Sequence, residues 1–294
     1  MIAGGWRGGG TVLFGGSGFV GTAILRLYPE MISAGRRASA APNRHVCVED
    51  LGNLAALRDV EFDRVICCVG TSRHVELMER PLAEALEAHM MPSVRLLEQL
   101  RERPLRSFVR LSTVLLYDEA RAGMPVDENS PIAPHRNRYL LSQYLGEQAA
   151  HFYERYFPVA TVRLCNLFGP WPGERTDLVH EVIAQLRRDG QASVRTRAPE
   201  RDFLYVEDAA RAVAALALAE RSGVFNLGSG EAVTVGRVVD VLSALSGCPV
   251  YSKEEKTRRI PRICVDAGKL RAATGWTPLH TLEDGLARTY AAGN

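Results

Sequence analysis

The amino-acid sequence predicts an α/β protein in which a doubly wound, mostly parallel sheet is followed by a smaller C-terminal lobe. Three observations support this fold class. Strand-like and helix-like stretches alternate over residues 1–165, glycines separate the first strand from the first helix, and residues 64–69 are continuously apolar after Arg64. Continuous apolar runs are typical of parallel strands covered on both faces. Ligands of such sheets bind outside the carboxyl ends of the strands.

Each element is expected from its local pattern. Thr11–Phe14 is a short run of strand formers that Gly15 ends, and Phe19–Leu27 has the apolar spacing of a helix. Pro104 and Pro158 close two later helices. The other elements expected in this part are strands at residues 31–34, 46–48, 64–69, 107–112 and 159–164, and helices at residues 81–89, 91–103 and 139–156.

Beyond Gly169 the pattern is less regular and rich in proline and glycine. The elements expected there are a helix at residues 177–188 and short strands at residues 192–196 and 224–227. We divide the chain into a sheet domain, residues 1–165, and a lobe, residues 166–294. We expect the two to be interleaved, with parts of residues 200–230 returning to the sheet domain.

Composition excludes several classes of protein. The chain has 294 residues, of which 46% are apolar and 24% charged, as in globular rather than disordered, fibrous or membrane proteins. Its 36 Lys and Arg nearly balance 34 Asp and Glu, so no overall field favours nucleic acid or an anionic membrane. No run of about 18 apolar residues occurs, and residues 1–10 lack a signal-peptide pattern. We expect a cytoplasmic protein.

The cysteines are scattered, and no pair has the C-x-x-C spacing of zinc ribbons or redox dithiols. We expect small buried hydrophobic residues at these positions and no metal site. The six are Cys47, Cys67, Cys68, Cys165, Cys248 and Cys264.

The segment GGSGFVG, residues 15–21, places glycines at 15, 18 and 21 between a strand and a helix. Backbone amides and the helix N-terminus there can approach a pyrophosphate closely, which predicts a dinucleotide site. The same glycines also fit a simple tight turn. The candidate contacts are Gly15, Gly18, Phe19, Val20 and Gly21.

The end of the second strand discriminates between dinucleotides, because an acidic residue there binds the ribose 2′-hydroxyl of NAD. Here Arg36 and Arg37 follow Gly35. Two guanidinium groups suit a 2′-phosphate, so NADP(H) is favoured and NAD(H) is the alternative. The two arginines are otherwise solvated loop residues.

From about Thr11 to Tyr290, the chain resembles the extended short-chain dehydrogenase/reductase family, which comprises nucleotide-sugar epimerases, dehydratases and 4-ketoreductases. The resemblance implies a Rossmann-type fold and a homodimer through helices of residues 81–103 and 139–156. Its landmarks, in order, are GGSGFVG, Glu49-Asp50-Leu51, LSTVLLYD from Leu111, Tyr139 with its helix, RLCNLFGP from Arg163, RDFLYVEDAARA from Arg201, FNLGSG from Phe225 and DAGKLRAATGWTP from Asp266.

The resemblance also implies roles for single residues. Thr113 is the catalytic Ser/Thr and Tyr139 the proton-transferring tyrosine, so both hydroxyls can hydrogen-bond one carbonyl oxygen that is being reduced. Asn166 and Arg201 are implied at the diphosphate side of a substrate; alternatively, Asn166 caps a turn and Arg201 pairs with an aspartate, Asp202 or Asp208. The further positions implied are Asp50, Leu51, Val69 and Gly70 for the cofactor, and an arginine among Arg258, Arg259 and Arg262 for the substrate.

One departure from the family concerns its Tyr-x-x-x-Lys pattern, which here reads Tyr139-Leu-Leu-Ser-Gln143. Residues four apart share a helix face, so Gln143 is expected at the lysine's place beside the nicotinamide ribose. An amide binds ribose hydroxyls but brings no charge to lower the pKa of a phenol. Alcohol oxidation needs tyrosinate, whereas carbonyl reduction needs only the neutral phenol. Gln143 therefore favours a reductase.

Two more departures concern other family positions. Val114 and Leu115 stand where dehydratases carry an Asp-Glu pair, which disfavours dehydration. Near His89 the family has an asparagine, and none is present. We expect His89 to be a packed or partly exposed helix residue rather than a catalytic one.

The interpretation that follows is an NADPH-dependent ketoreductase of a nucleoside-diphosphate keto-sugar, with Tyr139 as general acid, Thr113 orienting the carbonyl and Gln143 holding the ribose. An NAD(P)-dependent nucleotide-sugar epimerase is one alternative. A catalytically silent NADP(H)-binding sensor or partner protein is the other. The expected partners are a nucleotide sugar and a second copy of the chain, with neither nucleic acid nor membrane.

Overall fold

The computed structural model describes residues 10–70, 80–121, 123–173, 175–253 and 262–292. Its main feature is a seven-stranded sheet in which every neighbouring pair is parallel. The strand order places β1 beside β4 at the centre, so the chain changes direction across the sheet there. In that order the strands are β10 (Gly223–Leu227), β6 (Val159–Leu164), β5 (Ser107–Thr113), β4 (Arg64–Cys67), β1 (Thr11–Phe14), β2 (Ile32–Gly35) and β3 (His45–Cys47).

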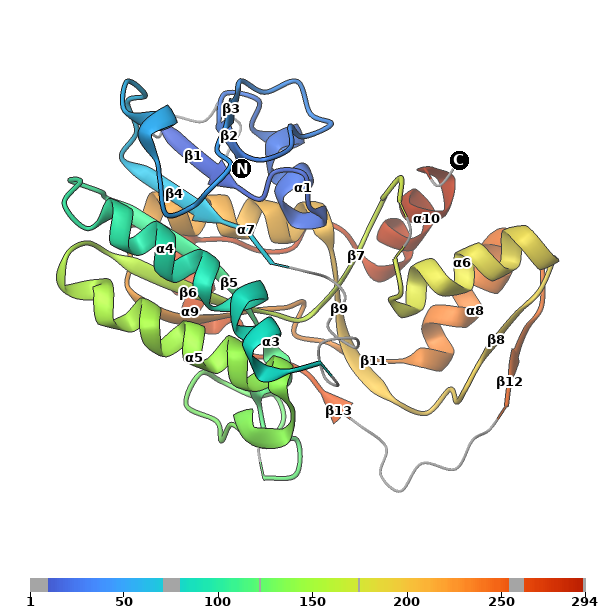
Figure 1. Ribbon diagram of the computed structural model, residues 1–294. Helices are drawn as coiled ribbons and strands as arrows, with labels where there is room; N and C mark the ends of the chain where they lie inside the picture. The colour runs from blue at the N-terminus through green and yellow to red at the C-terminus, as the bar shows by residue number, and fades with distance from the viewer. Residues whose placement is uncertain (1–9, 71–79, 122, 174, 254–261, 293–294) are drawn as a thin grey trace.

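Helices cover both faces of this sheet (Figure 1). On one face lie α1 (Phe19–Leu27), α7 (Val206–Ala219) and α9 (Gly268–Thr274), and on the other α3 (Leu82–His89), α4 (Met91–Leu100) and α5 (Arg138–Phe152). Successive residues of a strand point to opposite faces, so Val109 of β5 packs in the core beneath α1, α7 and α9, and Phe108 packs in the core on the opposite face. The doubly wound fold class predicted from the sequence is confirmed.

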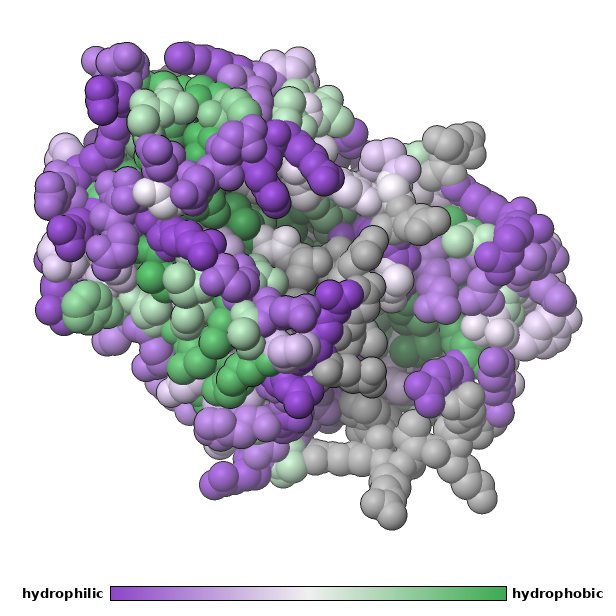
Figure 2. Space-filling model, viewed as in Figure 1, coloured by the Kyte–Doolittle hydropathy of each residue, from purple (hydrophilic) through white to green (hydrophobic). Residues whose placement is uncertain are grey.

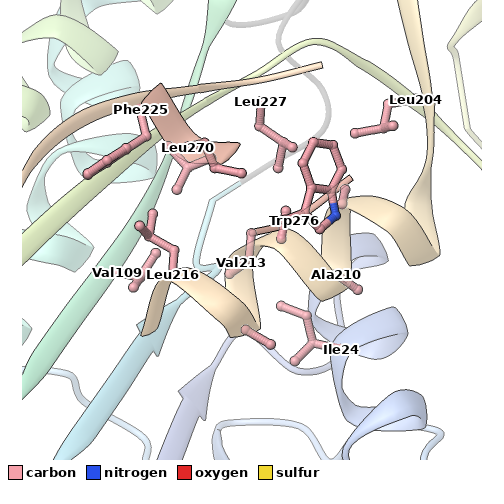
Figure 3. Packing of buried hydrophobic residues seen from close by; sticks show 14 of the residues in the cluster. Ile24, Val109, Leu204, Ala210, Val213, Leu216, Phe225, Leu227, Leu270 and Trp276 are labelled. Carbon is pink, nitrogen blue, oxygen red and sulfur yellow. The ribbon is translucent and has the colours of Figure 1, made fainter. Parts of the chain in front are cut away.

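Helix α7 packs closely because its inward face is rich in alanine, and Ala209, Ala210 and Ala212 have no exposed surface. Figure 3 shows its residues Val213 and Leu216 among side chains from β5, β10 and α9. Trp276 lies over the start of α7, where its indole N–H donates to the Asp208 carbonyl at 3.0 Å. A segment far along the chain thus completes the core of the sheet domain.

A second group of elements lies beside the sheet, at the right of Figure 1. β9 pairs with β11, β13 and β7, and β8 pairs with β12. The helices α6, α8 and α10 enclose a separate core with these strands, which includes Phe168, Leu186, Val238 and Leu286. The bounds are β7 (Asn166–Phe168), α6 (Leu178–Asp189), β8 (Ala192–Val194), β9 (Glu200–Tyr205), β11 (Ala232–Thr234), α8 (Val235–Ser246), β12 (Val250–Ser252), β13 (Arg262–Ile263) and α10 (Leu282–Ala292).

Several element ends differ from the predictions by a few residues. The strand expected at 64–69 stops at Cys67, where the chain turns along a cavity, and the helix expected at 139–156 ends at Phe152. Its last turn tightens into a 3₁₀ helix before Pro158. The 3₁₀ helices are Ala55–Leu57, Val114–Leu116, Pro134–Arg136 and Tyr153–Arg155.

The expectation that all cysteines are buried is wrong for three of them. Cys47 is exposed at the sheet edge, and Cys68 and Cys248 are half-buried, whereas Cys67, Cys165 and Cys264 are buried. Edge strand β3 leaves its outer side open to solvent, so position 47 need not pack. None of the helices described has both the length and the apolar character needed to cross a bilayer.

Candidate active site

A cavity of about 480 Å³ opens at the carboxyl ends of β1, β4, β5 and β6. This is the edge at which the sequence predicts a ligand, and it lies where the strand order reverses between β1 and β4. The predicted site residues that line it are Gly18, Phe19, Val20, Gly21, Val69, Gly70, Thr113, Tyr139, Gln143 and Asn166.

The glycine-rich turn needs its glycines for conformation and for space. Gly15 has a φ of +83°, which favours glycine, and a Cβ on it would lie 2.6 Å from the Cys68 carbonyl carbon. A Cβ on Gly21 would lie 2.2 Å from the Gly15 carbonyl oxygen. The first turn of α1 has no acidic residue, and the helix begins at the cavity wall after Gly18. A dinucleotide pyrophosphate fits this cradle, because bare backbone and a helix N-terminus face the space it would take.

The other predicted cofactor residues stand apart from the cavity wall. Arg36 and Arg37 are exposed just beyond β2, at the same edge of the sheet. Asp50 is exposed, and its carboxylate accepts a hydrogen bond from the Gly52 amide at 2.8 Å. Leu51 packs partly buried against the sheet core.

Thr113 and Tyr139 come together from two elements. Thr113 is the last residue of β5, while Tyr139 lies in the first turn of α5, whose N-cap Asn137 accepts from the Leu140 amide at 2.9 Å. Both side chains are only 7% exposed. Burial raises the pKa of Tyr139 above its usual 10.0, and hydrogen bonding to Thr113 and Gln143 and the charge of Arg110 offset only part of that rise. The phenol is therefore held neutral around pH 7.

Gln143 follows Tyr139 by one helical turn and is likewise buried. Its Oε1 lies 3.3 Å from Nη2 of Arg110, and its Nε2 lies 3.2 Å from Nδ1 of His89. His89 is buried at the end of α3, and its ring meets that of Tyr139 edge to face at 5.1 Å. The packing expected for His89 is present, and its contact with the site was not foreseen.

Behind these residues, the next turn of α5 carries a buried ion pair. Glu147 accepts from Nε and Nη2 of Arg163 at 3.0 and 2.7 Å, and from the Ser112 hydroxyl at 2.6 Å. Three strong donors therefore occupy this carboxylate, which ties α5 to β5 and β6 and fixes the orientation of the helix that bears Tyr139.

The predicted substrate residues are spread along the second lobe. Asn166 lines the cavity, and its Nδ2 donates to the Asp202 carbonyl at 3.2 Å. Arg201 is half-buried and donates to the Glu200 carbonyl at 3.0 Å. Arg262 is 58% exposed and pairs with the Glu200 carboxylate at 2.6 Å. Arg258 and Arg259 lie outside the described residues.

Arg201 does not form the alternative ion pair with Asp202 or Asp208, since both carboxylates bind other groups. Asp202 accepts from the Ser229 amide and hydroxyl at 2.7 and 2.8 Å and from the Gly230 amide at 3.1 Å. Asp208 accepts from His280 and Arg211. Both carboxylates thus brace the loops around them.

Sequence reasoning missed a cluster on the far wall of the cavity. The guanidinium of Arg175 lies 3.8 Å from the ring centroid of Phe19, and its Nε donates to Asp177 at 2.6 Å. His180 Nδ1 lies 2.8 Å from the same carboxylate, and Trp171 meets Phe19 edge to face. The lobe therefore contacts the glycine-rich turn directly. The one sequence signal for this cluster was Asp177 at the start of an expected helix.

Comparison with known proteins places this geometry in a family. A model of the NAD dependent epimerase/dehydratase family matches residues 11–228. A putative UDP-glucose 4-epimerase of Methanocaldococcus jannaschii is 24% identical over 299 residues, covering 93% of this chain and 95% of the relative. A dTDP-6-deoxy-L-talose 4-dehydrogenase (NAD(P)(+)) of Kitasatospora kifunensis is 29% identical over 316 residues, covering 95% and 94%.

Solved structures agree on the fold. A UDP-N-acetylglucosamine 4-epimerase from Methanobrevibacter ruminantium M1, in complex with UDP-N-acetylmuramic acid, superposes with a TM-score of 0.86. The match covers 98% of each chain at 20% identity. The arrangement of sheet and lobe is therefore shared at this low sequence identity.

Proposed function

The chain belongs to the NAD-dependent epimerase/dehydratase family, and on that premise we propose that it is an NADPH-dependent ketoreductase acting on a nucleoside-diphosphate keto-sugar. The observation that carries this proposal is a buried phenol, Tyr139, whose pKa is raised and whose neighbour one turn along α5 is an uncharged amide. Such a phenol gives up a proton to a developing alkoxide more readily than it removes one from an alcohol.

The chain's own residues supply the binding and the proton. In this proposal, Thr113 and Tyr139 hydrogen-bond one carbonyl oxygen of the substrate, which polarises the carbonyl and fixes its direction. Reduced nicotinamide, when bound, supplies the hydride that the carbonyl carbon takes. The oxygen then takes the phenolic proton of Tyr139, which leaves an alcohol and a phenolate that solvent reprotonates. The oxygen of the Gln143 amide has a second lone pair, which can accept a hydrogen bond from a ribose hydroxyl.

NADPH is the cofactor we propose, because Arg36 and Arg37 stand exposed at the end of β2 and form no ion pair within the described residues. Their charges are available to a 2′-phosphate. The glycine-rich turn offers the adjoining surface for a pyrophosphate. Arg175 is also stacked on Phe19 at this turn, with its charge paired to Asp177.

A nucleotide sugar is the proposed substrate class. Support comes from the names of the relatives and from Asn166, which lies in the same cavity as Thr113 and Tyr139. Arg201 is proposed at the diphosphate side. We further propose that two chains associate through α3, α4 and α5.

Purified protein with NADPH and a panel of 4-keto nucleotide sugars tests the proposal by loss of reduced-nicotinamide absorbance. Tyr139→Phe should lower the rate by about 10²–10⁴ while NADPH still binds, since a general acid contributes that much. Tyr144→Phe, a hydroxyl removed from the same helix, is the matched control.

Two other outcomes would replace the proposal. Epimerisation of a UDP-sugar with no net use of NADPH would favour the epimerase, the activity that the name of the M. jannaschii relative suggests. Tight NADPH binding without turnover of any substrate would favour a silent sensor.

A further inference from the structure

Arg110 is a charged residue in the middle of a strand that is buried on both faces. The strand β5 reads SFVRLST, and Arg110 is 1% exposed. It lies two residues from both Phe108 and Ser112, so its side chain shares their face of the sheet, the one covered by α4 and α5. Burying a guanidinium costs free energy unless polar groups compensate its charge. The contacts of Arg110 therefore indicate its role.

The guanidinium packs against α5 between Gln143 and Gly146, on the turns that follow Tyr139. A Cβ on Gly146 would be 2.7 Å from Nη2 of Arg110 and 3.3 Å from Cζ, so the guanidinium would have to shift to admit a side chain there. Nη2 donates to Oε1 of Gln143 at 3.3 Å. Within the described part of the chain, Nε and Nη1 have no hydrogen-bond partner. Glu147, the carboxylate next along α5, is occupied by Arg163 and Ser112.

This contact fixes which way the Gln143 amide faces. A guanidinium can only donate, so the amide must present its oxygen to Arg110 and its NH₂ to the other side. Nε2 of Gln143 then donates to Nδ1 of His89, 3.2 Å away, and its second hydrogen is free for the phenol of Tyr139. His89 must carry its proton away from Nδ1 to accept this bond.

We propose that Arg110 is a positioning residue for Tyr139, which acts by holding the Gln143 amide as a donor toward the phenol and by keeping any second cation out of position 143. The proposal rests on the proposed function only for its effect on rate. The structural part of the proposal concerns which charges the side chains at positions 110 and 143 can carry together, and we call this the sign rule. With arginine at 110, a negative or neutral acceptor fits at 143 and a positive side chain does not.

The sign rule is tested by unfolding, without any substrate. Gln143→Lys sets an ammonium against the buried guanidinium, and it should lower the folding equilibrium constant at least about tenfold. In an Arg110→Met background the same lysine should cost less than about threefold. Gln143→Glu, which can pair with Arg110, should be tolerated better than Gln143→Lys in the wild-type background.

Arg64→Met is the matched control, because Arg64 is a buried arginine on the neighbouring strand that pairs with Asp63 and Glu220 instead. It should not relieve the cost of Gln143→Lys. Equal costs for lysine and glutamate at 143, or equal costs of the lysine with and without Arg110, would overturn the proposal. If Arg110→Met does not fold, the comparison of Gln143→Lys with Gln143→Glu decides alone.

The effect on Tyr139 is read by spectroscopy and by rate. Ultraviolet difference titration against Tyr139→Phe should show the phenol ionising at higher pH in Arg110→Met than in wild type, and Arg110→Lys should restore most of the shift. The rate of keto-sugar reduction should fall about tenfold in Arg110→Met, with the substrate KM within about twofold.

The outcomes separate the two proposals. A wild-type protein that reduces no keto-sugar, yet shows the sign rule and the phenol shift, would remove the proposed function and keep the positioning role. Equal loss of rate in Arg110→Lys and Arg110→Met with an unmoved phenol would mean that Arg110 only fills space, and would overturn the inference.

Discussion

Burial of the single residue Tyr139 favours carbonyl reduction over alcohol oxidation, because it raises the pKa of the phenol. Desolvation raises its pKa, so below about pH 9 nearly every molecule carries the neutral phenol. Keto-sugar reduction should then be flat from about pH 6 to about pH 9. Alcohol oxidation needs the phenolate, and its kcat/KM should rise about tenfold per pH unit over that range.

Initial rates in both directions, measured with Tyr139→Phe as the blank, give these two profiles. If the kcat/KM of alcohol oxidation stopped rising below about pH 8, the phenol would ionise near neutrality. That result would contradict the proposed preference for reduction.

The charges of Arg36 and Arg37 decide a second property, the choice of dinucleotide. Charge-assisted hydrogen bonds contribute about 1.5–3 kcal/mol each, so replacing both arginines by serine should weaken NADPH binding at least about a hundredfold and leave NADH binding within about threefold. Titration calorimetry with both cofactors measures this. Arg44→Ser, an exposed arginine just before β3, at the amino ends of the strands, is the control. An equal loss for NADH would mean that the two arginines do not distinguish the 2′-phosphate.

Single residues also show where prediction from sequence stopped. The glycine-rich turn and the Thr113–Tyr139 pair lie at one cavity because their spacing relative to strands and helices determines their place. Arg110 was visible as a charge inside an apolar strand, yet its partner Gln143 is 33 residues away. Only the packing of α5 on β5 brings them together. Arg175 stayed hidden for the same reason, since its contact with Phe19 depends on how the lobe sits.

Asp177 acts at the scale of an element, because it begins α6 and ties that helix to the cavity wall. It caps the helix at the His180 amide and accepts from the side chains of His180 and Arg175. Burial acts to raise the pKa of Asp177, but these partners prevail and lower it to about 2. A depressed carboxyl pKa adds stability above the unfolded value of 3.8, and this is lost as the pH falls toward 2.

Asp177→Asn keeps the capping oxygen and removes the charge, so it should cost about 2 kcal/mol at pH 7, and this cost should shrink steadily as the pH falls below about 4 and be small by about pH 2. Urea unfolding of both proteins at several pH values measures the difference. Asp189→Asn at the other end of α6, where the carboxylate pairs with Arg188 at the surface, should change little. A cost of Asp177→Asn that does not shrink with acid would contradict the assignment.

Elements of the sheet domain were predicted better than those of the lobe. The runs at β1, α1 and β6 have clear periods and clear ends, and their bounds agree with the sequence patterns. Neither helix α7 nor the strand β9 before it was predicted, and the helix VEDAARAVAALALA is apolar or small on nearly all sides, which hides its period. Strands such as β13 are two or three residues long and exist only through their pairing with β9. Such pairing is a tertiary property that a local pattern does not contain.

At the scale of the whole molecule, the cavity lies between the sheet and the lobe, while the face formed by α3, α4 and α5 points away from both (Figure 1). Figure 2 shows hydrophobic residues gathered over this face. On α5, Leu141 and Leu145 are only half-buried and Phe152 is 49% exposed, whereas Gln143 and Gly146 are buried. Spacings of four and seven residues put the three apolar side chains on one side of the helix.

A second copy of the same face would cover these side chains in a four-helix contact, with twofold symmetry. Light scattering on a sizing column should then give twice the 32.3 kDa of one chain. Leu145→Glu buries a charge in the contact and should yield monomers, whereas Leu279→Glu, at a leucine 66% exposed elsewhere, should not. Because α5 also carries Tyr139 and Gln143, the monomeric variant should reduce keto-sugars more slowly than the dimer. A wild-type protein that stays monomeric at about 10 μM would refute the dimer, and a fully active Leu145→Glu monomer would show that α5 is held by its own sheet alone.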